Sequence, residues 1–248
     1  MSDSKPRQQE KSAIVIGATG LVGADLVKQL VASGQYQTIY QIVRHEPKSA
    51  PNAPSQNTAN HEVLKTIVVP DFAQLSQSLT GLNLRGADAF STLGTTLKQA
   101  GSRQAFKQVD FTYNLNFARI CKQLGVQHFL LLSATGADST SFIFYNKIKG
   151  QLEQAVEKLG FMRLSIFQPS LLIGEHKEQR MLEGLGQQVF KMTQHLVPDT
   201  WAYRPIEAKR VAQAMCIVAN QTPIPTANLD KIIYSNTQLL TLTLENPA

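Results

Sequence analysis

A strand-like run, a glycine-rich turn and a helix-like stretch follow one another near the start of the chain, and this order constrains the fold most. Residues 12–17 read SAIVIG, an apolar run of the length expected for a buried parallel strand. The turn GATGLVG occupies residues 17–23, and Leu21, Leu26 and Leu30 then recur at helical spacing. The pattern predicts a strand that turns sharply into a helix, the first unit of an α/β fold.

The same alternation continues along most of the chain. Further strands are expected at 38–43, 64–69, 87–93, 128–133 and 162–167, and helices at 21–34, 72–79, 103–124 and 143–159. We therefore predict one Rossmann-type domain over residues 12–248, with a doubly wound, mostly parallel sheet. Residues 1–11 predict a disordered tail, and the polar stretch 45–60 predicts a surface loop.

The alternation breaks after Pro169. Helical patterns at 180–195 and 206–219 and a short strand at 231–234 follow. We expect residues 170–248 to form a small C-terminal cap over the carboxyl edge of the sheet, where open α/β sheets bind ligands. Trp201, Tyr203 and Arg204 either line a substrate pocket there or anchor the cap by packing.

The glycine spacing fits the phosphate-binding turn of a dinucleotide site. Gly17 permits a sharp turn, Gly20 leaves room for pyrophosphate, and Gly23 lets the helix pack close to the sheet. Free N–H groups at the helix start attract phosphate. The alternative is a glycine-rich corner without a ligand. The other turn residues predicted to contact the cofactor are Thr19, Leu21 and Val22.

An arginine follows the second predicted strand, in the sequence Val43-Arg44-His45. An acidic residue at this point would bind the ribose 2′-hydroxyl of NAD, whereas the forked donors of Arg44 suit a 2′-phosphate. The sequence therefore favours NADP(H) over NAD(H). The alternative is a solvated arginine at a strand end.

Tyr145 and Lys149 are four residues apart on a predicted helix and so share one face. The ammonium group favours the phenolate, and the tyrosine can then exchange a proton with a carbonyl oxygen as hydride moves. The spacing alone is common. Ser133 at the end of the fifth predicted strand strengthens the interpretation, because its hydroxyl would reach the same ligand site.

Several further stretches accompany these motifs in a characteristic order. They read STLGTT at 91–96, HFLLLS at 128–133, GAD at 136–138 and FQPS at 167–170, and Gly150 follows Lys149. Together with the glycine turn, Ser133 and the Tyr-x-x-x-Lys pair, they resemble the atypical or extended branch of the short-chain dehydrogenase/reductase superfamily. The likeness is greatest to the Tat-interacting-protein-like oxidoreductases, and it runs from about residue 12 to 220.

The resemblance implies a role for each matching position. Ser133 would polarise the substrate carbonyl, Tyr145 would be the acid/base, and Lys149 would tune Tyr145 and hold the nicotinamide ribose. Many members of the superfamily carry an asparagine where this chain reads Val109-Asp110-Phe111, so Asp110 or Asn114 takes its place in the proton relay. The remaining implied contacts are Asp71 and Phe72 by the adenine, Leu93 and Gly94 along the adenosine ribose, Pro169, Ser170 and Leu171 at the nicotinamide, and Arg44 at the 2′-phosphate.

These residues predict an NADP(H)-dependent oxidoreductase acting on a small carbonyl or alcohol substrate. One alternative is a regulator that senses NADP(H) and binds another protein, as some members of this branch are thought to do. Another is a sugar-nucleotide epimerase or dehydratase, although the segment after Pro169 leaves little chain for a nucleotide-sugar domain.

Composition argues against other classes of protein. The net charge is +6, but the basic residues are scattered, so we expect an anionic cofactor rather than nucleic acid. The chain has no run of 18 apolar residues, which predicts no transmembrane helix and no membrane partner. Its polar start lacks the apolar stretch of a signal peptide, so we expect a cytoplasmic protein.

Cysteines, histidines and the remaining aromatic residues predict structural roles. Cys121 and Cys216 are expected to be buried thiols, and His128 and His176 lack partners at metal-ligand spacing, so no metal is expected. Three phenylalanines on the predicted helix 103–124 fit either the core or an interface between copies, which leaves monomer and homodimer open. These residues are Phe106, Phe111 and Phe117.

Overall fold

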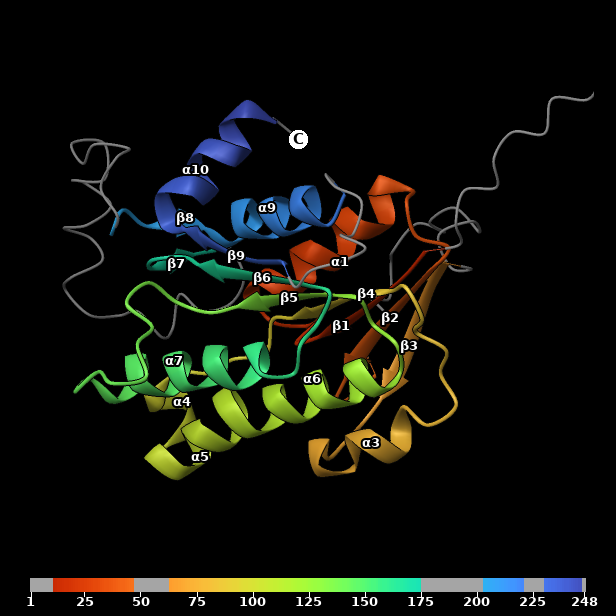
Figure 1. Cartoon of the computed structure of the whole chain (residues 1–248), viewed down its shortest axis with the longest axis horizontal. Coiled ribbons are helices and arrows are strands. Elements are labelled where there is room, and N and C mark those ends of the chain that lie inside the picture. Colours follow the sequence, from red (N-terminus) through yellow and green to blue (C-terminus); the bar gives the residue numbers. More distant parts are fainter. Residues whose placement is uncertain (1–10, 47–62, 175–202, 221–229, 247–248) are drawn as a thin grey trace, which may run out of the picture.

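A seven-stranded sheet forms the centre of the computed structural model, which describes residues 11–46, 63–174, 203–220 and 230–246 (Figure 1). The strand order is β3-β2-β1-β4-β5-β6-β9, and all neighbours are parallel. The strands are β1 Ser12–Ile16, β2 Thr38–Val43, β3 Leu64–Val68, β4 Asp88–Ser91, β5 His128–Leu132, β6 Arg163–Gln168 and β9 Asp230–Ser235. The predicted Rossmann fold is confirmed, and β1 and β4 flank the switch point of the strand order.

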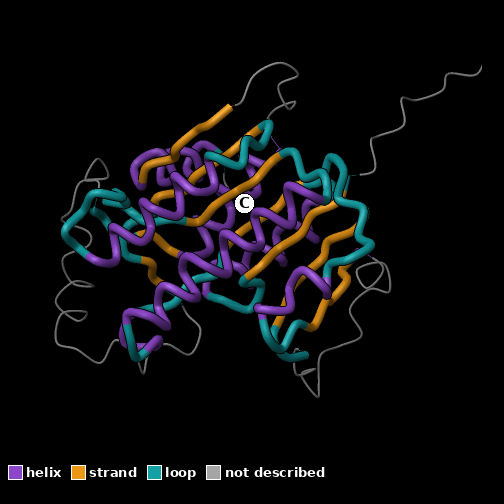
Figure 2. The backbone as a smooth tube through the Cα atoms, turned by 60° about the horizontal axis from the view of Figure 1, so that its bottom comes forward, coloured by secondary structure: helices purple, strands orange, loops and turns teal. Residues whose placement is uncertain are grey.

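Helices cover both faces of the sheet, and Figure 2 shows the strands as a twisted layer between them. On one face lie α1 Leu21–Ser33, α9 Ala208–Asn220 and α10 Asn236–Glu245 (Figure 1). On the other lie η1 Phe72–Gln74, α3 Leu75–Ser78, α6 Asn114–Gln123 and α7 Phe144–Glu157. The short helices α4 Leu97–Ala100 and α5 Arg103–Lys107 precede α6.

The central strands β1, β4, β5 and β6 are buried on both faces, whereas the edge strands β3 and β9 are partly exposed. Val15 and Phe90 belong to the core beneath α1 and α9, whereas Ile14 and Ile16 belong to the core beneath α6 and α7. Each strand thus contributes alternate residues to two cores. The thiols of Cys121 and Cys216 are buried on opposite faces.

Two segments predicted to cap the sheet instead complete it. Residues 206–219 overlap most of α9, which packs against α1, and residues 231–234 lie in β9, which pairs in parallel with β6. A parallel strand requires a crossover connection, and α9 supplies the helix for it. The small parallel pair β7 Leu172–Ile173 and β8 Ile206–Glu207 follows the carboxyl end of β6. The helix predicted at 180–195 lies outside the described residues.

The predicted helix at 103–124 is also not continuous. After α5 the chain widens into a π-helical stretch, η2 Gln108–Tyr113, before α6 begins at Asn114. The Asn114 side chain donates to the Val109 carbonyl (2.9 Å), which helps to satisfy the carbonyls of the wider turn. Such insertions are common at functional sites.

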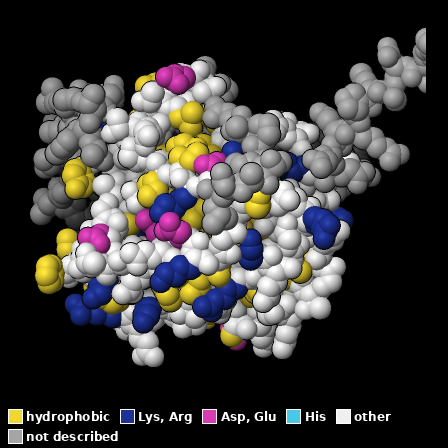
Figure 3. Space-filling view, viewed as in Figure 1, with side chains coloured by type: hydrophobic (Ala, Val, Ile, Leu, Met, Phe, Trp, Pro, Cys, Tyr) yellow, Lys and Arg dark blue, Asp and Glu magenta, His cyan; other side chains and the backbone are white. Residues whose placement is uncertain are grey.

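The surface shown in Figure 3 carries Lys and Arg side chains separated by uncharged, apolar and acidic ones, with several over α5, α6 and α7. Within the described ranges, no helix has the length and apolar character needed to cross a membrane. Residues 1–10 of the predicted tail lie outside those ranges. Its last residue, Lys11, is held by the Asp88 carboxylate, with Nζ 2.6 Å from Oδ2.

Candidate functional site

The carboxyl ends of four adjacent strands bring the predicted site residues to one edge of the sheet. Gly17 follows β1, Leu93 and Gly94 lie in the loop after β4, Ser133 follows β5 and Pro169 follows β6. Because these strands are neighbours and all parallel, residues far apart in the sequence meet at this edge. Arg44 and Asp71 lie at the same edge, beyond the ends of β2 and β3.

The glycine turn forms a cradle that side chains would fill. Gly17 has a φ of 77°, and a Cβ there would lie 2.6 Å from the backbone nitrogen of Leu93. The Gly20 N–H donates to the Gly17 carbonyl (2.9 Å), and Gly20 is the N-cap of α1 without a side-chain cap. A Cβ on Gly23 would overlap that carbonyl oxygen. The first amides of α1 are therefore left for an external anion, so the turn fits a dinucleotide phosphate.

The remaining predicted cofactor residues surround this turn. Thr19, Arg44 and Gly94 are exposed. The Asp71 carboxylate accepts from the Ala73 N–H (2.9 Å) and so caps η1. The Phe72 ring is buried and packs edge-on against Tyr113 with centroids 5.6 Å apart.

Lys149 and Asp110 form a buried ion pair beside the loop that follows β4. The Lys149 Nζ lies 2.7 Å from Asp110 Oδ1, and Asp110 Oδ2 accepts from the Thr95 N–H (2.9 Å). Burial is the largest single effect and opposes the charged ammonium, but Asp110, Tyr145 and Glu153 together raise the pKa of Lys149 above its ordinary value. A Cβ on Gly94 would meet Asp110 Oδ1 at 3.4 Å and Lys149 Nζ at 3.8 Å, so the pair touches the predicted cofactor loop.

Asp110, and not Asn114, contacts the lysine. The Asn114 amide donates to the carbonyls of Leu93 (3.1 Å) and Val109 (2.9 Å) and accepts from the Ser91 hydroxyl (2.6 Å). Its polar atoms thus hold the backbone around η2. The π-helical stretch places the carboxylate of Asp110 within reach of α7.

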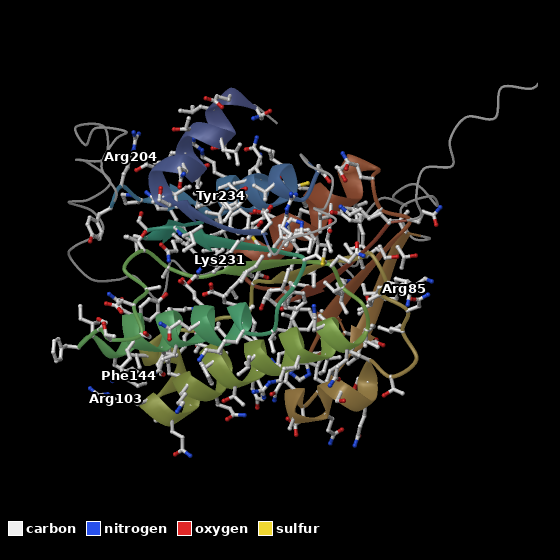
Figure 4. All side chains as sticks on the ribbon, in the orientation of Figure 1. Arg85, Arg103, Phe144, Arg204, Lys231 and Tyr234 are labelled. Atoms are coloured by element: carbon white, nitrogen blue, oxygen red, sulfur yellow. The ribbon has the colours of Figure 1, made fainter. Side chains whose placement is uncertain are left out.

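Tyr145 is half-buried in the first turn of α7, and its ring packs on Phe106 with centroids 5.6 Å apart. Lys149 Nζ lies 6.0 Å from the Tyr145 ring centroid. Gly150 allows this placement of α7, because a Cβ there would overlap the backbone of Asp138 and Ser139. Nearby, Arg103 of α5 lies over the Phe144 ring at 5.2 Å, and both are labelled in Figure 4.

Ser133 is buried, and its hydroxyl donates to Glu153 Oε1. Gln168, at the end of β6, donates from Nε2 to both oxygens of the same carboxylate (3.0 and 3.1 Å). A direct hydrogen bond between Ser133 and Tyr145 is not among the contacts of the described residues. The two residues are linked through α7, which carries Tyr145, Lys149 and Glu153 at successive turns.

The loop after β6 is held by a residue from the other end of the chain. The Ser170 N–H donates to Asn236 Oδ1 (3.0 Å), and the Ser170 hydroxyl and the Asn236 amide both donate to the Arg204 carbonyl. Pro169 is buried, whereas Leu171 is 53% exposed. Arg204, labelled in Figure 4, lies just before β8, at the start of the described segment 203–220.

Sequence reasoning missed two side chains that touch the predicted machinery, Glu153 and Asn236. The spacing could have identified Glu153, because it lies four residues after Lys149 and eight after Tyr145 and so shares their helical face. Asn236 carries none, since nothing in the local sequence relates the start of α10 to Ser170.

The parallel sheet, its switch point and the open glycine turn define a Rossmann-type nucleotide-binding protein. The sequence model of a family described as NAD(P)H-binding matches residues 17–163. The chain is 33% identical to Protein FMP52, mitochondrial, of Lodderomyces elongisporus over 200 residues, covering 79% of this chain and 82% of the relative. It is 34% identical to Protein HTATIP2 of Rattus norvegicus over 197 residues, covering 79% and 75%. The chain belongs to the NAD(P)H-binding family, and the resemblance found in its sequence is confirmed.

Solved structures share the fold. An oxidoreductase of the short-chain dehydrogenase/reductase family from Burkholderia thailandensis has a TM-score of 0.62 at 16% identity and covers 93% of both chains. MoeE5 in complex with UDP-glucuronic acid and NAD has a TM-score of 0.62 at 14% identity, covering 90% of this chain and 76% of its own. At these identities the likeness concerns architecture alone.

Proposed function

We propose that the protein is an NADP(H)-dependent oxidoreductase that interconverts a small carbonyl compound and its alcohol, with Ser133, Tyr145 and Lys149 as its reacting side chains. One observation carries the proposal. The buried Lys149–Asp110 pair touches Gly94, and the neighbouring Leu93 packs against Gly17 of the glycine turn. A charged lysine beside both a dinucleotide turn and a tyrosine is the arrangement that proton-coupled hydride transfer requires.

The chain's own residues supply the proton and the electrostatics of the proposed reaction. NADPH held by the glycine turn and the loop after β4 would supply the hydride for the carbonyl carbon. Tyr145 gives its hydroxyl proton to the carbonyl oxygen, which completes the alcohol, and Ser133 donates a hydrogen bond to that oxygen as negative charge develops. Lys149, kept charged by Asp110, stabilises the phenolate left on Tyr145 until a proton from water restores it.

Replacing Tyr145 by phenylalanine tests the proposal. NADPH consumption is followed with benzaldehyde, cyclohexanone and diacetyl as probes, and NADPH binding is measured by fluorescence titration. Tyr145→Phe removes the proton donor, so we expect kcat to fall roughly 10²- to 10⁴-fold while NADPH binding persists. Tyr40→Phe makes the same change within β2 and serves as the matched control.

A protein that only senses NADP(H) would give a different result. It would bind NADPH, turn over none of the probes and respond to Tyr145→Phe no more than to Tyr40→Phe. Binding of neither NADPH nor NADH would contradict the cofactor site itself.

The location and assembly of the protein are proposals of the same kind. We propose a cytoplasmic protein that works as a monomer or homodimer, although the names of the fungal relatives describe those proteins as mitochondrial. Fractionation of the source cells and sedimentation of the purified chain test these points.

A further inference from the structure

A buried carboxyl group contacts Ser133 and has no part in the proposed reaction. Glu153 lies on α7, one turn after Lys149, and is 9% exposed. Its carboxylate accepts a hydrogen bond from the Ser133 hydroxyl and two hydrogen bonds from Gln168 Nε2. Its carboxylate therefore ties the ends of β5 and β6 to the helix that carries Tyr145.

This contact conflicts with the proposed use of Ser133. A serine hydroxyl has one proton to donate, and when Glu153 is ionised that proton is directed to Glu153 Oε1, because a carboxylate can only accept. Reduction requires the same proton to point to the carbonyl oxygen of the substrate. The conflict disappears when Glu153 is protonated, because its O–H then donates to Ser133 Oγ and leaves the serine proton free.

We propose that the protonation state of Glu153 sets the direction of the Ser133 hydroxyl, so that neutral Glu153 releases Ser133 to the substrate and ionised Glu153 withdraws it. The inference rests on the proposed function, because it assigns Ser133 to a carbonyl oxygen. Glu153 is thereby a positioning residue that acts through Ser133.

The surroundings of Glu153 support a neutral form. Burial raises the pKa of the Glu153 carboxyl above its ordinary value, against the hydrogen bonds from Ser133 and Gln168 and the ammonium groups of Lys149 and Lys231. Lys149 is engaged by Asp110 (2.7 Å), and Lys231 of β9, labelled in Figure 4, is engaged by Glu157 (2.6 Å). Each of these two ammonium groups thus forms its ion pair with a carboxylate other than that of Glu153.

The first test is the pH profile of carbonyl reduction. In the wild type, kcat/KM falls as pH rises through the titration of Glu153. In Glu153→Gln the amide N–H donates permanently to Ser133 while its oxygen still accepts from Gln168, so this decline disappears. At high pH the variant is expected to exceed the wild type by up to roughly 10²- to 10³-fold, the usual effect of one donor to a developing oxyanion. Glu157→Gln makes the same change one turn further along α7, at an exposed position, and keeps the decline.

The second test needs no turnover. Carboxyl-carbon NMR of protein labelled in its glutamate side chains follows the titration of Glu153, identified by the resonance that Glu153→Gln removes. Because burial raises its pKa, Glu153 is expected to titrate above the ordinary range of a glutamate. Ser133→Ala removes a hydrogen bond to the ionised form and shifts the Glu153 titration to still higher pH.

Distinct outcomes overturn the inference and the proposed function. The inference is wrong if Glu153→Gln folds and binds NADPH but loses turnover, or if Ser133→Ala leaves the Glu153 titration unchanged. If NADPH binds and none of the carbonyl probes is reduced, the proposed reductase activity fails, and the NMR titrations alone decide whether Glu153 and Ser133 are coupled. Should Glu153→Gln not fold, the Ser133→Ala titration gives the same decision, with the Glu153 resonance assigned by through-bond correlation to its backbone amide.

Discussion

A single exposed arginine at the end of β2 carries the proposed preference for the phosphorylated cofactor. Arg44 forms no ion pair with another described residue, and its position beside the glycine turn leaves the guanidinium available to a 2′-phosphate. Arg44→Ala removes charge-assisted hydrogen bonds, so we expect NADPH to bind more weakly by about 1.5–3 kcal/mol, or roughly ten- to a hundredfold. NADH, which lacks the phosphate, should bind equally well to both proteins. Calorimetric titration with each cofactor measures the difference.

A matched arginine controls for the loss of positive charge. Arg85 is also exposed but follows the α3 segment at the opposite edge of the sheet, as Figure 4 shows, and Arg85→Ala should leave both affinities unchanged. A wild-type protein that prefers NADH, or an equal loss of both cofactors in Arg44→Ala, would refute the assignment.

Residue types were easier to predict than their partners. Tyr145, Lys149 and Ser133 follow from the sequence because helical spacing and strand ends fix their approximate position. The carboxylates that contact Lys149 and Ser133 depend on tertiary packing. Asp110 reaches Lys149 from another helix, and Glu153 reaches Ser133 from α7 across to the end of β5. Sequence left Asp110 and Asn114 as equal alternatives, and only the geometry of η2 separates them.

In the glycine turn, Gly20 and Gly23 have different roles: Gly20 leaves room for the phosphate, and Gly23 allows close packing. A Cβ on Gly20 would meet only the Gly17 oxygen at 3.2 Å, whereas a Cβ on Gly23 would overlap that oxygen and lie 2.7 Å from Thr92 Oγ1. We expect Gly20→Ala to cost about 1 kcal/mol of stability as an N-cap but to abolish detectable NADPH binding, because the methyl group occupies the phosphate approach. Gly23→Ala should cost about 1–3 kcal/mol by overpacking. Urea unfolding and fluorescence titration measure the two effects.

Gly34→Ala is the control for the turn, since Gly34 ends α1 at a φ of 63° with open space around it. It should lose some stability through backbone strain and keep NADPH binding. An equal loss of NADPH affinity in Gly20→Ala and Gly34→Ala would contradict the assignment of the glycine turn as the phosphate-binding site.

Elements were predicted well where periodicity is regular and poorly where insertions break it. The predicted strand 38–43 coincides with β2, and 12–17 exceeds β1 by one residue. The π-helical turn η2 escaped prediction because one extra residue per turn does not disturb an apolar pattern enough to be seen. The βα pattern resumes in α9 and β9, but the long segment after Pro169 separates them from the rest, so they were assigned to a cap. Their place in the sheet depends on pairing with β6.

Across the whole molecule, the two edges of the sheet carry different polar groups. The carboxyl edge holds the proposed chemistry, whereas the amino edge holds a buried network with no access to the glycine turn. Asp88 lies at the start of β4, 2.6 Å from both Lys11 Nζ and the Tyr36 hydroxyl. Arg163, at the start of β6, pairs with Asp230 at the start of β9 (2.9 Å). These contacts involve three strands, β4, β6 and β9, together with Lys11 before β1 and Tyr36 before β2, which points to a role in stability.

His128 lies within this network and gives it a pH dependence. Its Nε2 lies 2.9 Å from Ser165 Oγ, and burial, aided by the charges of Arg163 and Lys11, lowers its pKa to about 3. The unfolded chain binds a proton at His128 near pH 6.5, but the folded protein does not, so stability is lost as pH falls from about 6.5 towards 3. The loss reaches up to about 1.4 kcal/mol per pH unit.

His128→Gln keeps a partner for Ser165 and cannot be protonated. Its unfolding free energy, measured in urea from neutral to acidic pH, should therefore decline less steeply than that of the wild type. His45→Gln, at an exposed position beyond β2, should follow the wild type. Parallel curves for His128→Gln and the wild type would show that the amino edge does not exclude the proton from this histidine.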